Sequence, residues 1–213
     1  MSGTQRAATL SQTIADAFRR RRSTGLALKE HAEAMARAGY DMARRFHQGG
    51  KLIAFGNGGS STDAQHIAVE FVHPVIVGKR ALPAIALTND IATMSSVANH
   101  EGWDDVFAHQ LKYLAQPQDI ALGISVDGRC VNVVSGLTVA REMGLLTIAL
   151  TGGLQQTVLL RTTVDHLLAV SSEDPRIVKE LQVSIYHILW EVTHVFFDDP
   201  DALELRGTLG ARR

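Results

Sequence analysis

The sequence predicts an α/β protein built on a parallel five-stranded sheet with helices on both faces, in three α-β-α layers. Two observations carry this prediction. Apolar runs of strand length alternate with helical patterns along the chain, and each strand leads into a polar turn. Parallel strands joined by right-handed crossovers place those turns at one edge of the sheet, where ligands of open α/β folds bind. The predicted strands are residues 51–55, 82–87, 119–124, 145–150 and 165–170.

Length, net charge and cysteine content exclude several classes of protein. The chain has 213 residues, of which 46% are hydrophobic and 20% are charged, which suits one globular domain over residues 1–213. A net charge of -1 gives no electrostatic case for nucleic acid or an anionic membrane as a partner. A single cysteine, Cys130, excludes an intramolecular disulfide and fits a reducing compartment. The polar start and the lack of a long apolar run predict a cytoplasmic protein.

Two helices are expected before the first strand, within residues 1–50. Residues 4–18 are weakly helical and end in the arginine run 19–22, which we interpret as a solvated helix end. Residues 28–46 form a long amphipathic pattern, closed by Gly49 and Gly50. One face of these helices is too apolar to end at solvent, so we expect them to mediate oligomerisation.

The most informative stretch is residues 51–70, where an apolar run enters a glycine-rich turn and a helical pattern follows at once. Glycine lets a backbone approach a ligand closely, and the N–H groups at a helix start point into the turn. The turn is a natural seat for an anionic or hydroxyl-rich ligand, although any tight strand-to-helix connection favours glycine as well. In the helix that follows, His66 and Glu70 stand four residues apart and share one face.

The rest of the chain repeats the strand, turn and helix order. Residues 88–90 are expected to cap a helix over 91–98, and residues 103–114 have helical spacing. A polar turn over 125–130 precedes a helix at 131–143, and residues 151–153 are expected to be a turn.

The final helix, residues 175–197, shows two stripes. The apolar stripe is expected to pack on the core, and the polar stripe either faces solvent or reaches a partner subunit's site. The apolar members are Ile177, Leu181, Ile185, Ile188, Leu189, Val192 and Val195. The polar members are Glu180, Ser184, His187, Glu191 and His194. Beyond residue 198 we expect a frayed end.

Several of these stretches together resemble the sugar isomerase (SIS) domain family, and within it the phosphoheptose isomerases. The likeness covers nearly the whole chain. It rests on residues 56–60, 63–66, 82–87, 123–125, 128, 150–152 and 186–189. The resemblance implies a flavodoxin-like five-stranded parallel sheet, with two N-terminal helices that assemble a homotetramer. It also implies active sites that lie between subunits.

The resemblance further implies chemistry and ligands. Those isomerases interconvert ketose and aldose phosphates, which needs a base for a carbon-bound proton and an acid for the carbonyl oxygen. Glu70 and His187 match the base and acid pair, although they could instead form a structural hydrogen-bonded pair. Many relatives also bind zinc through positions that match His66, Glu70, His187 and a glutamine of the last helix. The matching sugar-binding turn residues are Asn57, Gly58, Gly59 and Ser60.

The chain departs from the family at the phosphate-binding turn. Relatives carry Ser-Thr-Ser-Gly-Asn-Ser there, whereas this chain carries Ser125, Val126, Asp127, Gly128, Arg129 and Cys130. Beside a phosphate, the carboxylate of Asp127 would cost on the order of 4 kcal/mol per charge pair at about 4 Å and an effective dielectric near 20. Arg129 would offset part of this cost if it turned inward.

Two further positions depart from the family. His100 stands where relatives have a substrate-binding aspartate, and Lys179 stands where they have the zinc-binding glutamine. An ammonium group has no lone pair and repels a divalent cation. We therefore expect no zinc, with Lys179 bringing a positive charge close to Glu70; the alternative is that Lys179 points to solvent.

Two functions follow from these matches and departures. The first is an enzyme that binds a phosphorylated sugar or sugar derivative and interconverts its ketose and aldose forms. The second is a non-catalytic regulatory or adaptor protein of the same fold, which binds a sugar derivative or a protein partner. Asp127 and Arg129 discriminate between them, because they disfavour phosphate under the first hypothesis and are harmless under the second.

Overall fold

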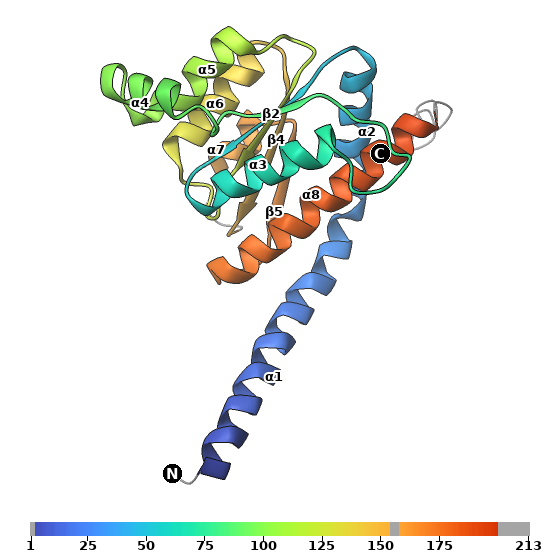
Figure 1. Cartoon of the computed structure of the whole chain (residues 1–213), viewed down its shortest axis with the longest axis vertical. Helices are drawn as coiled ribbons and strands as arrows, with labels where there is room; N and C mark the ends of the chain where they lie inside the picture. The colour runs from blue at the N-terminus through green and yellow to red at the C-terminus, as the bar shows by residue number, and fades with distance from the viewer. Residues whose placement is uncertain (1–2, 154–157, 200–213) are drawn as a thin grey trace.

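The sheet predicted from the sequence is present. The computed structural model describes residues 3–153 and 158–199. In these residues, five parallel strands lie in the order β2-β1-β3-β4-β5, with helices on both faces (Figure 1). The order reverses direction between β1 and β3, which makes their carboxyl ends the topological switch point at which doubly wound folds bind ligands. The fold therefore directs attention to the turns that follow these two strands.

The strands confirm the expected positions, with two corrections at their ends. They are β1 (Leu52–Gly56), β2 (Ala84–Ala86), β3 (Ile120–Ile124), β4 (Leu146–Gly152) and β5 (His166–Val170). Strand β2 is shorter than expected, because it pairs only with β1 at the edge of the sheet. Strand β4 runs through Thr151 and Gly152, expected as a turn, because both pair with β5.

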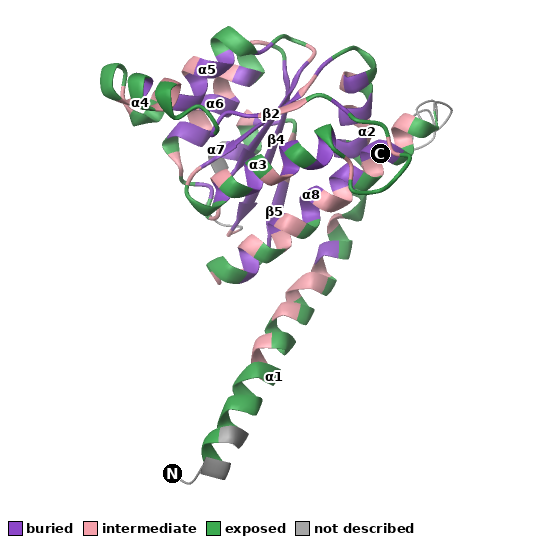
Figure 2. Ribbon diagram, in the orientation of Figure 1, coloured by how far each residue is buried: buried purple, intermediate pink, exposed green. Residues whose placement is uncertain are grey.

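Side chains alternate between two cores on opposite faces of the sheet. On one face, Leu52 and Leu122 pack against α2, α3 and α8. On the other face, Ile53 and Phe55 pack against α4, α5, α6 and α7. All five residues of both β1 and β3 are buried, as continuous apolar runs predict for central parallel strands (Figure 2).

The helices also follow the expected order, and one was not expected. They are α1 (Gly3–Ala27), α2 (Ala32–His47), α3 (Gly59–Val72), α4 (Ile91–His100), α5 (Val106–Leu114), α6 (Val131–Glu142), α7 (Val158–Thr163) and α8 (Pro175–Asp198), with short 3-10 turns η1 (Leu28–His31) and η2 (Trp103–Asp105). Helix α7 was not predicted. The predicted cap of α4 is present, since Asp90 accepts a hydrogen bond from the Thr93 N–H at 3.0 Å.

The first helix corrects the interpretation of the arginine run. Helix α1 continues through residues 19–22 to Ala27 instead of ending there. Within this run, Arg21 forms a two-point ion pair with Glu180 of α8, with N···O distances of 2.7 and 2.8 Å. The run is therefore helix interior. Its members Arg19, Arg20 and Arg22 are exposed, as expected, and Arg21 joins α1 to α8.

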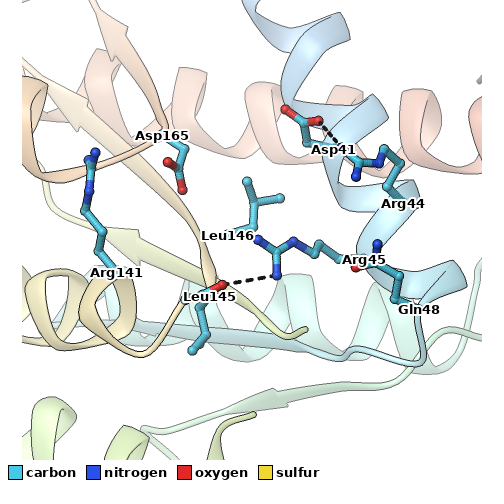
Figure 3. Close-up of a pocket in the computed structure, with 9 residues that line it drawn as sticks. Asp41, Arg44, Arg45, Gln48, Arg141, Leu145, Leu146 and Asp165 are labelled. Atoms are coloured by element: carbon cyan, nitrogen blue, oxygen red, sulfur yellow. Dashed lines mark hydrogen bonds and ion pairs between the residues drawn. The ribbon is translucent and has the colours of Figure 1, made fainter. Parts of the chain in front are cut away.

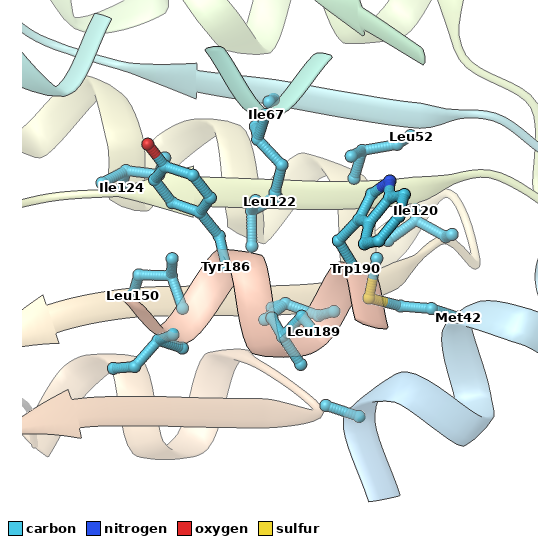
Figure 4. Packing of buried hydrophobic residues seen from close by; sticks show 14 of the residues in the cluster. Met42, Leu52, Ile67, Ile120, Leu122, Ile124, Leu150, Tyr186, Leu189 and Trp190 are labelled. Atoms are coloured by element: carbon cyan, nitrogen blue, oxygen red, sulfur yellow. The ribbon is translucent and has the colours of Figure 1, made fainter. Parts of the chain in front are cut away.

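Helix α8 packs on the core with a face that differs from the predicted stripe. His194, assigned to the polar stripe, is fully buried, and its ring nitrogens contact the carbonyl oxygens of Trp190 and Arg80. Val195, assigned to the apolar stripe, is 57% exposed. The buried face keeps Ile177, Ile185 and Leu189 of the predicted stripe and adds Tyr186 and Trp190 (Figure 4). The cause is the crossing of α8 over α3, which brings large ring side chains inward.

Helix α1 extends away from the rest of the described chain (Figure 1). Leu10, Ile14 and Phe18 follow one another at four-residue steps along it and are all exposed, Phe18 to 69%. Among the described residues, no helix combines the length and apolar character needed to cross a membrane. The apolar stripe on α1 is thus a surface that no element of the described ranges 3–153 and 158–199 covers.

Candidate active site

The candidate site has two parts: the turns over residues 57–58 and 125–130, which follow β1 and β3, and a group of side chains further along α3 and α8. The Asn57 side chain joins the two turns through a reciprocal amide pair with Asn132 at the start of α6. The two N···O distances are 2.7 and 3.0 Å. The side-chain amide of Asn57 is therefore engaged within the protein, where it links the first turn to the start of α6.

The glycines of the first turn are required by its geometry. Gly58 has a φ of 53°, a left-handed conformation that side-chain-bearing residues rarely adopt. A Cβ on Gly56 would lie 2.6 Å from the Ile124 carbonyl oxygen, so β1 could not approach β3 as closely. The turn thereby brings the start of α3, with Ser60 buried, against the end of β3.

Three of the predicted side chains converge. One ligand-type atom from each of His66, Glu70 and His187 lies within 4.8 Å of the others. His66 Nε2 is 3.2 Å from Glu70 Oε1, and the His66 and His187 rings meet edge to face, with centroids 5.2 Å apart. Glu70 is only 8% exposed, whereas the two histidines are partly open to solvent. A buried carboxylate beside two imidazoles suits proton transfer.

Two hydrogen bonds from residues of α8 hold His66 and Glu70 in place. The Tyr186 hydroxyl is 2.8 Å from His66 Nδ1, and Trp190 Nε1 donates to the Glu70 carbonyl oxygen at 2.9 Å. Burial, followed by the charges of Asp63 and Glu70, raises the pKa of the Tyr186 hydroxyl well above its ordinary value. The phenol therefore remains protonated over the whole neutral range.

Lys179 takes neither of the places expected for it. It forms an ion pair with Asp63 and donates to the Gly59 carbonyl oxygen. It therefore does not pair with Glu70, and it does not point to solvent. Asp63 is almost fully buried, and a buried carboxylate attracts the nearest cation strongly. The result is a link between α8 and the start of α3 beside the glycine-rich turn.

In the turn over residues 125–130, two backbone N–H groups donate hydrogen bonds to side chains of the same turn. Arg129 N donates to Asp127 Oδ1 at 3.0 Å, and Gly128 N donates to the Ser125 hydroxyl, also at 3.0 Å. Asp127 and Arg129 are both exposed, and Cys130 accepts a weak contact from Ser125 at 3.4 Å. Two backbone N–H groups that could hold an anion are thus already occupied.

His100 lies apart from this group. It sits at the exposed end of α4, where its Nδ1 donates to the Ser96 carbonyl oxygen at 2.8 Å.

Four residues that the sequence interpretation left out belong to the site: Asp63, Asn132, Gln182 and Tyr186. Asp63 could have been found, because it lies three residues before His66 on the same helix face. Gln182 Nε2 donates to the Ser125 carbonyl oxygen at 2.8 Å, and this contact depends on how α8 crosses the sheet. No local pattern predicts it.

A second cavity, of about 590 Å³, lies at the opposite, amino edge of the sheet (Figure 3). Two of its arginines bind backbone carbonyl groups, since Arg45 donates to Pro117 and Gly144 and Arg141 donates to Thr162. Arg44 pairs with Asp41 at 3.7 Å. Its Asp41 pairs with His166 at 2.9 Å. The charged groups of this cavity are thus engaged within the protein, so we place the functional site at the other group of residues.

The donor set of the candidate site fits a metal ion. His66, Glu70 and His187 supply two imidazoles and one carboxylate, a combination that holds catalytic zinc with a further position left open. The fourth ligand expected from relatives is replaced by Lys179, which Asp63 binds. The expectation that this lysine excludes zinc stays a prediction.

Comparison with known proteins identifies the family of this chain. The family model described as "SIS domain" matches residues 19–152. The chain belongs to the SIS domain family. It is 40% identical over 162 residues to a phosphoheptose isomerase of Thermodesulfovibrio yellowstonii, covering 76% of this chain and 80% of that protein.

Solved SIS structures share the architecture as well. A phosphoheptose isomerase of Francisella tularensis superposes with a TM-score of 0.81 at 30% identity, over 86% of this chain and 97% of that one. The phosphoheptose isomerase of Neisseria gonorrhoeae gives 0.79 at 28% identity, over 86% and 98%. The recognised family and the flavodoxin-like strand order are therefore confirmed.

Proposed function

We propose that this SIS-domain protein is an isomerase that interconverts the ketose and aldose forms of a phosphorylated sugar. The observation that carries the proposal is the convergence of Glu70 and His187 from α3 and α8, which pack on one face of the sheet. The similarity to proteins named phosphoheptose isomerases supports a phosphorylated heptose as the substrate.

Glu70 and His187 share the proton transfers of the isomerisation. Glu70 removes the proton from the carbon next to the carbonyl, while His187 donates a proton to the carbonyl oxygen, which gives an enediol. Glu70 then returns its proton to the former carbonyl carbon, and His187 takes the proton of the neighbouring hydroxyl. Proton and charge balance at each step, and no group is oxidised by the protein.

A metal ion would add one contribution. Zinc, if bound by His66, Glu70 and His187, would supply a Lewis acid that polarises the carbonyl. The residues of the chain would still bind and orient the sugar, through the turn at 57–60 and the loop at 125–130.

The test follows the carbon-bound proton. Incubation of a phosphorylated ketoheptose with the protein in D2O should give the aldose with deuterium incorporated, as observed by NMR. Glu70→Gln and His187→Asn should each lower the rate at least about 100-fold. Glu191→Gln, an exposed carboxylate one turn further along α8, should leave the rate unchanged. An active Glu70→Gln variant would contradict the assignment.

The second candidate is a non-catalytic protein that binds a sugar derivative or a protein partner. The loop at 125–130 favours it, because Asp127 occupies a donor that a phosphate would use. Under this hypothesis, a sugar derivative without a phosphate raises the melting temperature, and the sugar phosphate incorporates no deuterium.

We also propose a homo-oligomer, with a tetramer as the expected state. The exposed apolar stripe of α1 lies beside an apolar groove of about 480 Å³, lined by Leu28, Met35, Leu181 and Ile188. A second copy of the chain would present the same apolar stripe, and a symmetric pair would cover both stripes. The single cysteine and neutral charge support a cytoplasmic location, with no nucleic acid or membrane partner.

A further inference from the structure

Tyr186 occupies a place in the site that the proposed acid and base do not explain. It directly precedes His187 on α8, and the residue is fully buried in the core between α8 and the sheet (Figure 4). Its hydroxyl is 2.8 Å from His66 Nδ1, and its ring lies 4.8 Å from the His187 ring, centroid to centroid. Tyr186 therefore touches one histidine with its polar end and the other with its face.

The direction of the hydrogen bonds follows from the chemistry of the groups. The hydrogen of a buried phenol needs an acceptor, and His66 Nδ1 is the group that the Tyr186 hydroxyl contacts among the described residues, so the O–H donates and Nδ1 accepts. A neutral imidazole that accepts at Nδ1 carries its proton at Nε2. That N–H faces Glu70 Oε1 at 3.2 Å. The three groups thus form a chain in which each donates to the next.

The burial of the three groups shows which one is fixed. The side chain of His66 is 43% exposed, so solvent alone would leave its ring free to rotate. Tyr186 is enclosed by the core and cannot follow such a rotation. The rigid group therefore sets the position of the mobile one, and the histidine in turn presents a directed N–H to the carboxylate.

We propose that Tyr186 is a positioning residue, which fixes the ring orientation and the Nε2–H tautomer of His66 and thereby orients the Glu70 carboxylate. This inference rests on the proposed function only for its kinetic consequence. The tautomer itself is a property of the protein without substrate. The competing explanation is that Tyr186 merely fills the core, in which case phenylalanine would serve equally well.

The experiment compares Tyr186→Phe with a matched control on the same helix. Tyr186→Phe keeps the buried ring and removes only the hydroxyl. Thr193→Val likewise removes one buried hydroxyl, which contacts Met42 Sδ at 3.8 Å on the side of α2, away from His66. Nitrogen-15 NMR of histidine-labelled protein, free of substrate and treated with a chelator to remove any metal ion from His66, reports the tautomer, and His66→Gln assigns the signal.

We expect His66 to be the Nε2–H tautomer in the wild type and in Thr193→Val, and a mixture of tautomers in Tyr186→Phe. An Nδ1–H tautomer in the wild type, or unchanged His66 signals in Tyr186→Phe, would overturn the proposal.

The kinetic arm uses the same variants. Tyr186→Phe should lower kcat about tenfold or more, with KM changed less than about twofold, while Thr193→Val leaves both unchanged. Equal losses in the two variants would show a structural role only and overturn the proposal. A wild type without isomerase activity would instead contradict the proposed function. The NMR measurement, which needs no activity, would still decide the role of Tyr186.

Discussion

At the scale of single residues, Asp127 is the clearest departure from what a phosphate site requires. Its carboxylate accepts the Arg129 N–H and lies 3.3 Å from the Ser125 hydroxyl. A phosphate at this loop would meet both a like charge and donors that are already engaged. The side chain is exposed, so it can move without disturbing the core.

Replacement of Asp127 should therefore strengthen binding of a sugar phosphate. We expect Asp127→Ser to raise the affinity at least about tenfold, which corresponds to about 1.4 kcal/mol. Asp127→Asn separates the two causes, because it removes the charge but keeps the side-chain acceptor for Arg129. Isothermal titration of the three proteins measures the effect, and unchanged affinity in both variants would contradict the repulsion argument.

Lys179 carries the second prediction at this scale. We expect the wild type to purify without stoichiometric zinc, and Lys179→Gln to bind zinc more tightly, since the amide removes a charge and adds a ligand oxygen. Lys179→Met is the control that removes the charge without adding a ligand. Elemental analysis and metal titration decide the matter. One zinc ion per subunit in the wild type would refute the prediction.

At the scale of elements, the packing of α8 against α2 and α3 decides the geometry of the site. Helix α8 brings His187, Tyr186 and Lys179 to residues of α3, each about 116 to 120 positions away in the chain. Its other side presses on α2 at Gly39, where an added Cβ would lie 2.7 Å from Val192 Cγ1. The close approach of the two helices depends on this glycine.

Gly39→Ala should lower the free energy of unfolding by about 1–3 kcal/mol, because the two helices must move apart. Val192→Ala in the same chain should restore part of the loss by making room for the methyl group. Gly25→Ala is the matched control within a helix: its Cβ meets Leu181 at an ordinary 3.7 Å, so we expect a gain of up to about 1 kcal/mol. Urea unfolding measures all four proteins.

At the scale of the whole molecule, α1 is the feature that a single subunit leaves unexplained. Most of this helix projects from the described chain, and a helix without tertiary packing is only marginally stable in water (Figure 2). Its exposed apolar residues recur at four-residue steps on one side. Contact with another copy would stabilise the helix and cover this side at once.

Charges on the stripe should dissociate the oligomer. We expect the paired substitution Ile14→Glu and Phe18→Glu to reduce the molecular mass measured by light scattering at micromolar concentration. Gln12→Glu with Ser23→Glu adds the same charge at polar positions of α1 and should leave the mass unchanged. A wild type that is already a monomer under these conditions would contradict the prediction.

The sequence by itself determined the sheet and half of the site. Central parallel strands are buried on both faces, so they appear as short continuous apolar runs, and the order of elements followed directly. The shared face of His66 and Glu70 was equally readable, because residues four apart in a helix always lie on one side. Local geometry is enough for such features.

Only the tertiary structure decided which side chains meet across the site. The ion pair of Lys179 with Asp63, the hydrogen bond of Tyr186 with His66, and the burial of His194 all depend on the angle at which α8 crosses α3. A helix with apolar residues around much of its circumference can pack by more than one face, and its periodicity does not choose between them. The choice comes from the fit of Tyr186, Trp190 and the sheet residues beneath them, which is a property of the packed core.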